Sequence, residues 1–143
     1  MIMHTCSEVI SFARQLENES AGFYESLARK YAKDGDVFLS FAKENKKNIV
    51  QIERAYYGVI SDAIEGCFAF ETDTAGYTFE TELAGDASYA GALSRAVEIE
   101  VKIVKFYSDA AEQSKALMAD VPRNFTLVAK KRSNRISKLQ SLR

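Results

Sequence analysis

Four stretches of the chain carry side chains at alternating steps of three and four residues, the spacing that turns one helix face toward a core. In the first stretch the core-facing residues are Ile10, Ala13, Glu17, Ser20, Tyr24, Leu27 and Tyr31. In the second they are Phe38, Phe41, Asn45, Asn48, Ile52, Ala55 and Val59. The third has Leu93, Ala96, Glu100, Ile103, Tyr107, Ala110 and Ser114, and the fourth has Phe125, Val128, Arg132, Arg135, Leu139 and Leu142. This pattern predicts four long amphipathic helices.

Residue types that begin and end helices set the expected bounds. In chain order these signals are Thr5 with Glu8 as a capping box, Asp34-Gly35-Asp36, Asp86 or Ser88, and Asp120 with Pro122. We therefore expect one domain over residues 1–143, with helices at about 5–33, 36–64, 87–117 and 121–142.

The connection between the second and third helices, residues 65–86, lacks the helical pattern. Its apolar residues alternate with polar ones, which indicates extended chain, but the neighbouring sequence offers no partner strand. We expect a long crossover over the helices, with its apolar side chains facing inward, so that the third helix runs parallel to the second. The predicted fold class is all-α, a four-helix bundle of two antiparallel hairpins joined by this crossover. The alternating apolar residues are Phe68, Phe70, Tyr77, Phe79 and Leu83.

The composition of the chain argues against several kinds of partner and metal site. A net charge of -1 argues against a nucleic-acid partner. No apolar run approaches membrane-spanning length, and no secretory signal opens the chain. Cys6 and Cys67 form no Cys-x-x-Cys pair, so a thiolate zinc or rubredoxin-type iron site is excluded, and two cysteines suit a reducing compartment. We expect a cytoplasmic protein without a nucleic-acid or membrane partner.

The most polar core-facing residues fall at one level of the predicted helices, and we call them the polar layer. An ionised carboxylate in a core needs a compensating cation, metal or proton. Di-metal carboxylate bundles place a Glu on two helices and a Glu-x-x-His on the other two, because i, i+3 spacing aims both side chains at one metal. The polar layer consists of Glu17, Asn45, Asn48, Glu100, Arg132 and Arg135.

At these residues the chain resembles the rubrerythrin branch of the ferritin-like superfamily, over roughly residues 5–142. Glu17 precedes Phe23-Tyr24 by six residues, and Glu100 precedes Phe106-Tyr107 by the same distance. The second helix also begins with the run Phe-x-x-Phe-Ala-Lys-Glu. The resemblance implies a bundle that, in intact members, holds two iron or manganese ions and reduces peroxide or activates oxygen.

The chain departs from the family pattern at most metal ligands. Glu17 and Glu100 match two family carboxylates, but Asn45-Lys46-Lys47-Asn48 and Arg132-Ser133-Asn134-Arg135 stand where the family has Glu-x-x-His. The only histidine, His4, precedes the first helix and cannot replace the lost ligands. Because the layer then carries two Glu and two Arg, it is already neutral, and we expect these side chains to form buried ion pairs.

Residues near the polar layer allow two alternative assignments at a metal site. A register shift of one residue would make Glu44 a ligand, but it would also present Lys131, which binds no metal. Tyr24 and Tyr107 resemble tyrosines beside the metal centre of relatives. We expect them instead to be core aromatic residues whose hydroxyl groups hydrogen-bond the polar layer.

The expected function is therefore a ferritin-like, rubrerythrin-like protein that has lost di-iron chemistry and acts as a non-catalytic structural or interaction module without a cofactor. The alternative is a rubrerythrin-type oxidoreductase with iron or manganese at a reduced site, dinuclear or mononuclear, that uses Glu17 and Glu100. A homodimer is expected because a second apolar stripe of the first helix is wider than the core needs, and it would pack under the crossover or on another subunit. The sequence names no other protein partner. The stripe consists of Val9, Phe12, Leu16 and Phe23.

Overall fold

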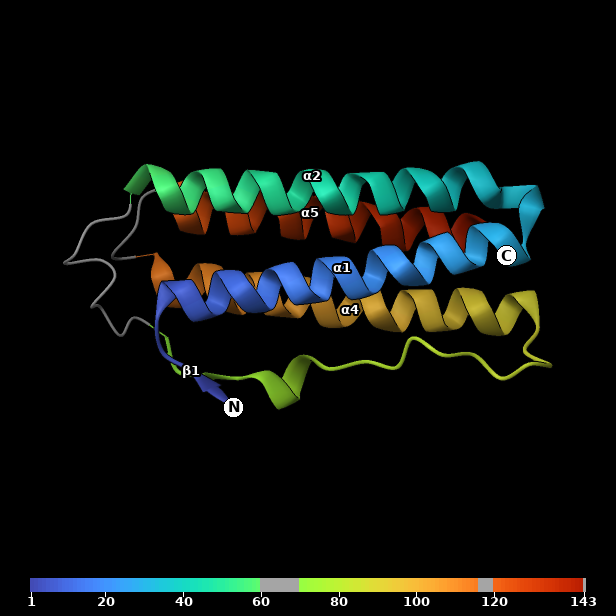
Figure 1. The fold of residues 1–143 in the computed structure, drawn as a ribbon, viewed down its shortest axis with the longest axis horizontal. Coiled ribbons are helices and arrows are strands. Elements are labelled where there is room, and N and C mark those ends of the chain that lie inside the picture. Colours follow the sequence, from blue (N-terminus) through green and yellow to red (C-terminus); the bar gives the residue numbers. More distant parts are fainter. Residues whose placement is uncertain (60–69, 116–119, 143) are drawn as a thin grey trace.

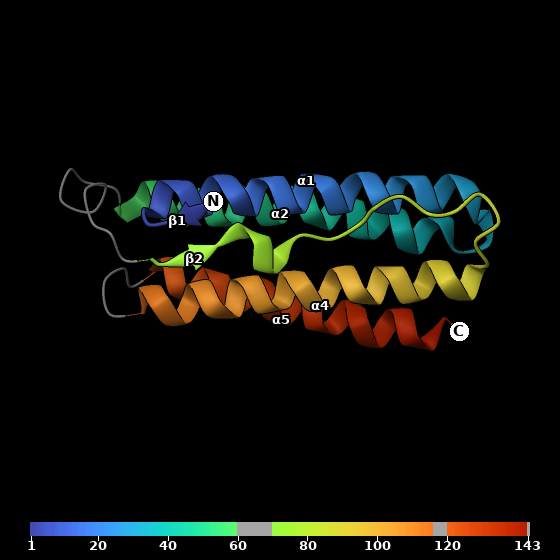
Figure 2. The same ribbon diagram turned by 90° about the horizontal axis from the view of Figure 1, so that it is seen from below.

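The structure is a computed structural model that describes residues 1–59, 70–115 and 120–142. In these ranges four long helices run side by side (Figures 1 and 2). α1 and α2 run antiparallel, as do α4 and α5, while α2 and α4 run parallel (Figure 1). The prediction of an all-α fold is confirmed. The helices are α1 (Cys6–Lys30), α2 (Gly35–Val59), α4 (Tyr89–Ser114) and α5 (Asp120–Ser141).

α1 begins at the predicted capping box. Thr5 Oγ1 accepts a hydrogen bond from the Glu8 N–H at 3.2 Å, and the Glu8 carboxylate accepts one from the Thr5 N–H at 3.0 Å. The helix ends at Lys30, short of the predicted residue 33, because the chain tightens into the 3₁₀ turn η1 (Ala32–Asp34). η1 leads directly into α2, which completes the first helix pair.

The second pair starts at the signals expected from the sequence. Ser88, and not Asp86, caps α4, and its Oγ accepts a hydrogen bond from the Gly91 N–H at 3.0 Å. Asp120 is the first helical residue of α5, with Pro122 in the first turn, where a missing N–H costs nothing. The predictions for the helix ends at 64 and 117, the crossover start at 65, Cys67 and Phe68 lie outside the described residues.

The described part of the crossover, residues 70–88, runs along the α1 and α4 side of the molecule and contains no α-helix (Figure 2). Here the expectation that no partner strand lies nearby is wrong. β2 (Thr72–Asp73) pairs antiparallel with β1 (Ile2–Met3), so the N-terminal residues supply the missing partner. The 3₁₀ turn η2 (Thr74–Tyr77) follows β2.

The predicted core-facing residues form the core. All those that the structure describes are buried, except Tyr31, Ala55 and Leu142, which are half-buried. In the crossover, Phe70 and Tyr77 are buried as expected. No helix in the described ranges is both long and apolar enough to cross a membrane.

The second apolar stripe of α1 is buried within the chain itself. Phe12 packs edge-to-face on Phe106 of α4, with ring centroids 5.4 Å apart. Tyr77 of the crossover packs on the same ring at 5.5 Å. Because the crossover lies over this region, the stripe is not available to a second subunit, and it gives no support for the expected dimer. The buried stripe residues are Val9, Phe12, Leu16 and Phe23.

Candidate functional site

Arg132 of α5 lies at the centre of the polar layer and is fully buried. Its Nη1 donates a hydrogen bond to Glu100 Oε1 at 2.7 Å, and its Nη2 forms an ion pair with Glu17 Oε2. Nη2 also donates to Ser20 Oγ at 2.9 Å. One guanidinium therefore joins the two buried carboxylates of α1 and α4. The structure contains the pairing that the sequence predicts for Arg132.

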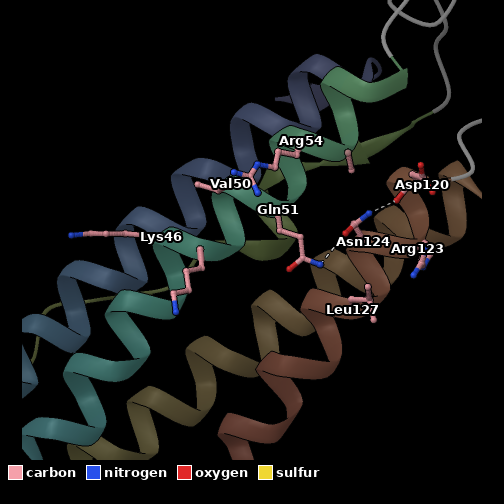
Figure 3. A pocket seen from close by; sticks show the side chains of 10 residues that line it. Lys46, Val50, Gln51, Arg54, Asp120, Arg123, Asn124 and Leu127 are labelled. Atoms are coloured by element: carbon pink, nitrogen blue, oxygen red, sulfur yellow. Dashed lines mark hydrogen bonds between the residues drawn. The ribbon is translucent and has the colours of Figure 1, made fainter.

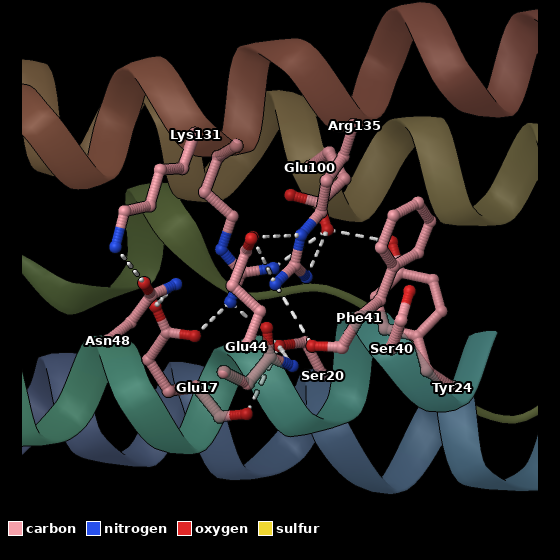
Figure 4. Close-up of polar contacts among 12 residues, drawn as sticks. Glu17, Ser20, Tyr24, Ser40, Phe41, Glu44, Asn48, Glu100, Lys131 and Arg135 are labelled. Atoms are coloured by element: carbon pink, nitrogen blue, oxygen red, sulfur yellow. Dashed lines mark hydrogen bonds and ion pairs between the residues drawn. The ribbon is translucent and has the colours of Figure 1, made fainter. Parts of the chain in front are cut away.

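Arg135 lies one turn further along α5, where it forms the expected ion pair with Glu100 and a further one with Glu44 that the sequence does not predict. Its Nη1 is 3.3 Å from Glu100 Oε1, while Nε and Nη2 donate to Glu44 Oε1 at 3.1 and 2.9 Å. Nη2 also donates to the Phe41 carbonyl oxygen at 3.0 Å, and the guanidinium stands 4.9 Å from the Phe41 ring centroid. Arg135 thus links α2 to α4 through Glu44 and Glu100, and within the described ranges it forms no ion pair with Glu17 (Figure 4).

The two asparagines of α2 satisfy polar atoms of α1. Asn48 Nδ2 donates to Glu17 Oε1 at 3.2 Å, and Asn45 Nδ2 donates to Ser20 Oγ at 2.8 Å. Ser20 Oγ in turn donates to the Glu17 carbonyl oxygen at 3.1 Å. Ser20 Oγ therefore accepts hydrogen bonds from both Asn45 and Arg132 and joins the asparagines of the layer to its central guanidinium.

Tyr24 and Tyr107 point their hydroxyl groups into the polar layer. Tyr24 donates to Glu100 Oε1 at 2.7 Å, and Tyr107 donates to Glu17 Oε1 at 3.0 Å. Burial raises the pKa of both phenols well above the usual value, and the neighbouring carboxylates raise it further. Both tyrosines are therefore neutral donors at physiological pH, which is the role expected of core aromatic residues.

Burial and neighbouring charges have opposite effects on the pKa values of the ionisable groups in the polar layer. Burial raises the pKa of Glu17, because the loss of water outweighs the attraction of Arg132 and Arg135. Burial alone would lower the pKa of Arg132, but Glu100 and Glu17 outweigh it and the net shift is upward, so the guanidinium stays charged. Three buried side-chain atoms have no hydrogen-bond partner within the described part of the chain. They are Asn45 Oδ1, Glu100 Oε2 and Arg132 Nε.

These residues do not fit the two metal ions that the family resemblance implies. The described ranges contain no group of three or more His, Cys, Asp or Glu side chains that could hold a metal ion. Glu17 and Glu100 both hydrogen-bond Arg132, so a divalent ion between them would stand beside a guanidinium cation. Like charges at such short range in a low-dielectric core repel strongly.

The sequence reasoning missed three partners of the polar layer. Ser20 is core-facing and stands three positions after Glu17, but the predicted polar layer does not include it. Glu44 and Lys131 lie off the core-facing stripe, yet long side chains beside such a stripe reach inward along their stems. Lys131 Nζ donates to Gln51 Oε1 at 2.8 Å and approaches Asn48 Oδ1 at 3.4 Å.

The layer repeats between the two helix pairs. Glu17 and Glu100 occupy corresponding positions in α1 and α4, and each accepts a hydrogen bond from the tyrosine of the other half. The asparagines of α2 correspond in the same way to the arginines of α5. Comparison of the chain with protein-family models, with curated proteins and with solved structures found no match.

Proposed function

We propose that this protein is a ferritin-like, rubrerythrin-like four-helix bundle whose di-metal centre has been replaced by ion pairs, and that it serves as a non-catalytic structural or interaction module. The observation that carries the proposal is the guanidinium of Arg132, buried between Glu17 and Glu100. It stands between the two carboxylates that correspond to family metal ligands, and it supplies the positive charge that metal ions would otherwise provide.

The charge balance supports this proposal. A di-metal site of the family type gathers about four carboxylates, which need divalent cations in order to coexist. Here Glu17 and Glu100 meet Arg132 and Arg135, and the other four family positions carry no carboxylate or imidazole. Two added metal ions would leave the layer strongly positive and without enough ligands.

Access to the layer supports a non-catalytic role. None of its six residues is more than 2 % exposed, so a substrate would have to displace packed helices to reach them. One observation favours the alternative, an oxidoreductase with a reduced iron or manganese site, because Glu100 Oε2 has no hydrogen-bond partner within the described residues. The adjacent cation Arg132 opposes metal binding at that oxygen.

Metal analysis tests the proposal directly. We expect protein purified without chelators, then incubated with ferrous or manganous salt and desalted, to retain no stoichiometric metal. One or two ions per chain, lost in Glu17→Gln and Glu100→Gln, would refute the replacement of the metal centre and support the metal-binding alternative instead.

A restored site provides the positive control. The substitutions Asn45→Glu, Asn48→His, Arg132→Glu and Arg135→His together rebuild both Glu-x-x-His motifs at the positions where the family resemblance puts them. If the bundle is ferritin-like, this folded variant gains about two metal ions per chain while the parent protein gains none. A variant that keeps its helical content but binds no metal would refute the ferritin-like geometry.

A further inference from the structure

A groove of about 630 Å³ lies between α2 and α5 (Figure 3), two helices on the side of the molecule away from the crossover (Figure 1). We call it the basic groove. Its volume lies in the range of sites that hold ligands. The residues that matter for its chemistry are Lys46, Lys47, Val50, Arg54, Arg123 and Leu127.

Positive charge dominates the lining of the basic groove. In the described ranges Lys46, Lys47, Arg54 and Arg123 line it, and Asp120 is the one carboxylate beside them. Among the described residues none of these four cations forms an ion pair, whereas several surface cations outside the groove do, such as those in the Arg14–Glu53, Lys105–Asp109 and Lys115–Glu112 pairs. The groove therefore presents cations whose charge the described part of the chain leaves uncompensated.

The basic groove also has apolar walls and a fixed floor. Val50 of α2 is 45 % exposed and Leu127 of α5 is 40 % exposed, so each wall offers an aliphatic side chain to solvent. Between them Gln51 Nε2 donates to Asn124 Oδ1 at 2.8 Å and bridges the two helices (Figure 3). Lys131 holds the other end of the Gln51 amide at 2.8 Å, so the floor is already ordered before any ligand binds.

We infer that the basic groove binds an acidic peptide segment of a partner protein, one that carries several carboxylates and apolar side chains. This inference rests on the proposed role of the protein as an interaction module and names the surface that performs it. It goes beyond the polar layer, because the groove lies on the outer surface of α2 and α5 and none of its lining residues belongs to that layer.

The spacing of the cations favours a ligand with charges distributed along its length. Lys47 and Arg54 are seven residues apart on α2, which corresponds to about 10 Å along the helix axis. A single phosphate group is too small to contact both. A nucleic-acid strand would find no base-stacking surface on the described lining, which contains no aromatic side chain, whereas Val50 and Leu127 suit the apolar side chains of a peptide.

The test is a binding titration with the full chain and a fluorescein-labelled peptide that carries glutamate and leucine at helical spacing. Arg54→Glu with Arg123→Glu reverses one charge on each wall, and we expect it to weaken binding by roughly tenfold or more. Lys46 extends away from α5 and is therefore not used (Figure 3). The matched control, Lys33→Glu with Lys138→Glu, changes net charge equally at exposed sites outside the groove and should bind like the parent.

A second variant separates the contribution of the apolar side chains to peptide binding from that of the charges. Val50→Ser with Leu127→Ser should weaken peptide binding at low and high salt alike, whereas the charge-reversal effect should fade as salt screens it. Circular dichroism melts check that every variant is folded.

Three results would overturn the inference. The first is equal peptide affinity in the groove variant and the matched control. The second is tighter binding of polyphosphate or a single-stranded oligonucleotide, with the same loss in Arg54→Glu/Arg123→Glu, which would make the groove a polyanion site. The third is self-association in sedimentation that this variant abolishes, which would make the occupant a second copy. None of these results changes the metal content, so failure of this inference is distinguishable from failure of the proposed function.

Discussion

Replacement of Arg132 by methionine should destabilise the protein more than any other single change in the polar layer. The substitution keeps a long apolar stem and removes the guanidinium. Among the described residues Glu17 then retains the neutral donors of Asn48 and Tyr107 alone, while Glu100 retains Arg135 with a nitrogen–oxygen distance of 3.3 Å. One fully buried carboxylate is left without a cation, and this typically costs ~3–5 kcal/mol of unfolding free energy.

The contacts of the two arginines predict a smaller loss of stability in Arg135→Met than in Arg132→Met. In Arg135→Met, Glu100 keeps Arg132 at 2.7 Å, and Glu44 is 37 % exposed and can be hydrated. The main loss is then the hydrogen bond to the Phe41 carbonyl oxygen, so we expect a cost of about 1–2 kcal/mol. At roughly 3 °C per kcal/mol for a chain of this size, Arg132→Met should lower Tm by about 10–15 °C and Arg135→Met by about 3–6 °C.

Removal of the whole ion-paired group should destabilise the protein less than removal of Arg132 alone. The triple variant Glu17→Gln, Glu100→Gln, Arg132→Met abolishes the desolvation cost of the ions together with their attraction, so it should recover more than half of the loss. The assay is urea denaturation followed by far-ultraviolet circular dichroism, with a chelator present. Arg54→Met, at an exposed position of α2, is the control and should change stability by less than about 0.5 kcal/mol.

One outcome would refute this reasoning. If Glu17→Gln and Glu100→Gln each stabilise the protein while Arg132→Met is neutral, the two carboxylates repel each other in the metal-free chain and the arginine does not compensate them. That behaviour is expected of an empty metal site, in which removal of a ligand charge relieves repulsion.

Three further predictions follow from individual contacts. In the folded protein the pKa of Glu17 lies above its ordinary value of 4.5, so the stability that protonated Glu17 contributes is present below pH 4.5 and is lost as the pH rises through the raised pKa. Denaturation at several pH values should show the parent protein losing stability relative to Glu17→Gln as the pH rises from 4.5 through the raised pKa. Tyr77 donates to Asp109 Oδ2 at 2.6 Å and helps to hold the pKa of that carboxyl below its usual range, so Tyr77→Phe should raise the pKa of Asp109 in an NMR titration. Ser88→Ala removes the cap bond to Gly91 and should cost about 1 kcal/mol in the same denaturation assay, whereas Ser88→Asp should retain most of the stability.

Residue periodicity was sufficient to predict the helices and what they bury. The steps of three and four place Glu17, Glu100, Arg132 and Arg135 at core-facing positions, and all four are buried in the structure. This worked because a helix has one repeat angle, so a residue's distance along the chain fixes the face on which it lies. The capping box at Thr5 was equally readable, because a cap involves only residues a few positions apart.

Contacts between helices were decided by the tertiary structure. Periodicity places Arg135 at the right level but not opposite a particular carboxylate, and its long side chain reaches Glu44, which lies off the core-facing stripe. Lys131 reaches the same layer from the side for the same reason. Side chains of this length cover several candidate partners, so the packing of neighbouring helices, and not the spacing within one helix, selects among them.

Local sequence patterns could not predict the pairing of the crossover strand β2 with β1. β1 and β2 are two residues each and are separated by about seventy residues in the chain, so neither stretch carries a recognisable signal. They meet because α1 starts, and the described crossover begins, at the same end of the molecule (Figure 1). The basic groove arises in the same way, since its walls belong to α2 and α5, and only the packing of these two helices against each other brings Val50 and Leu127 into one surface.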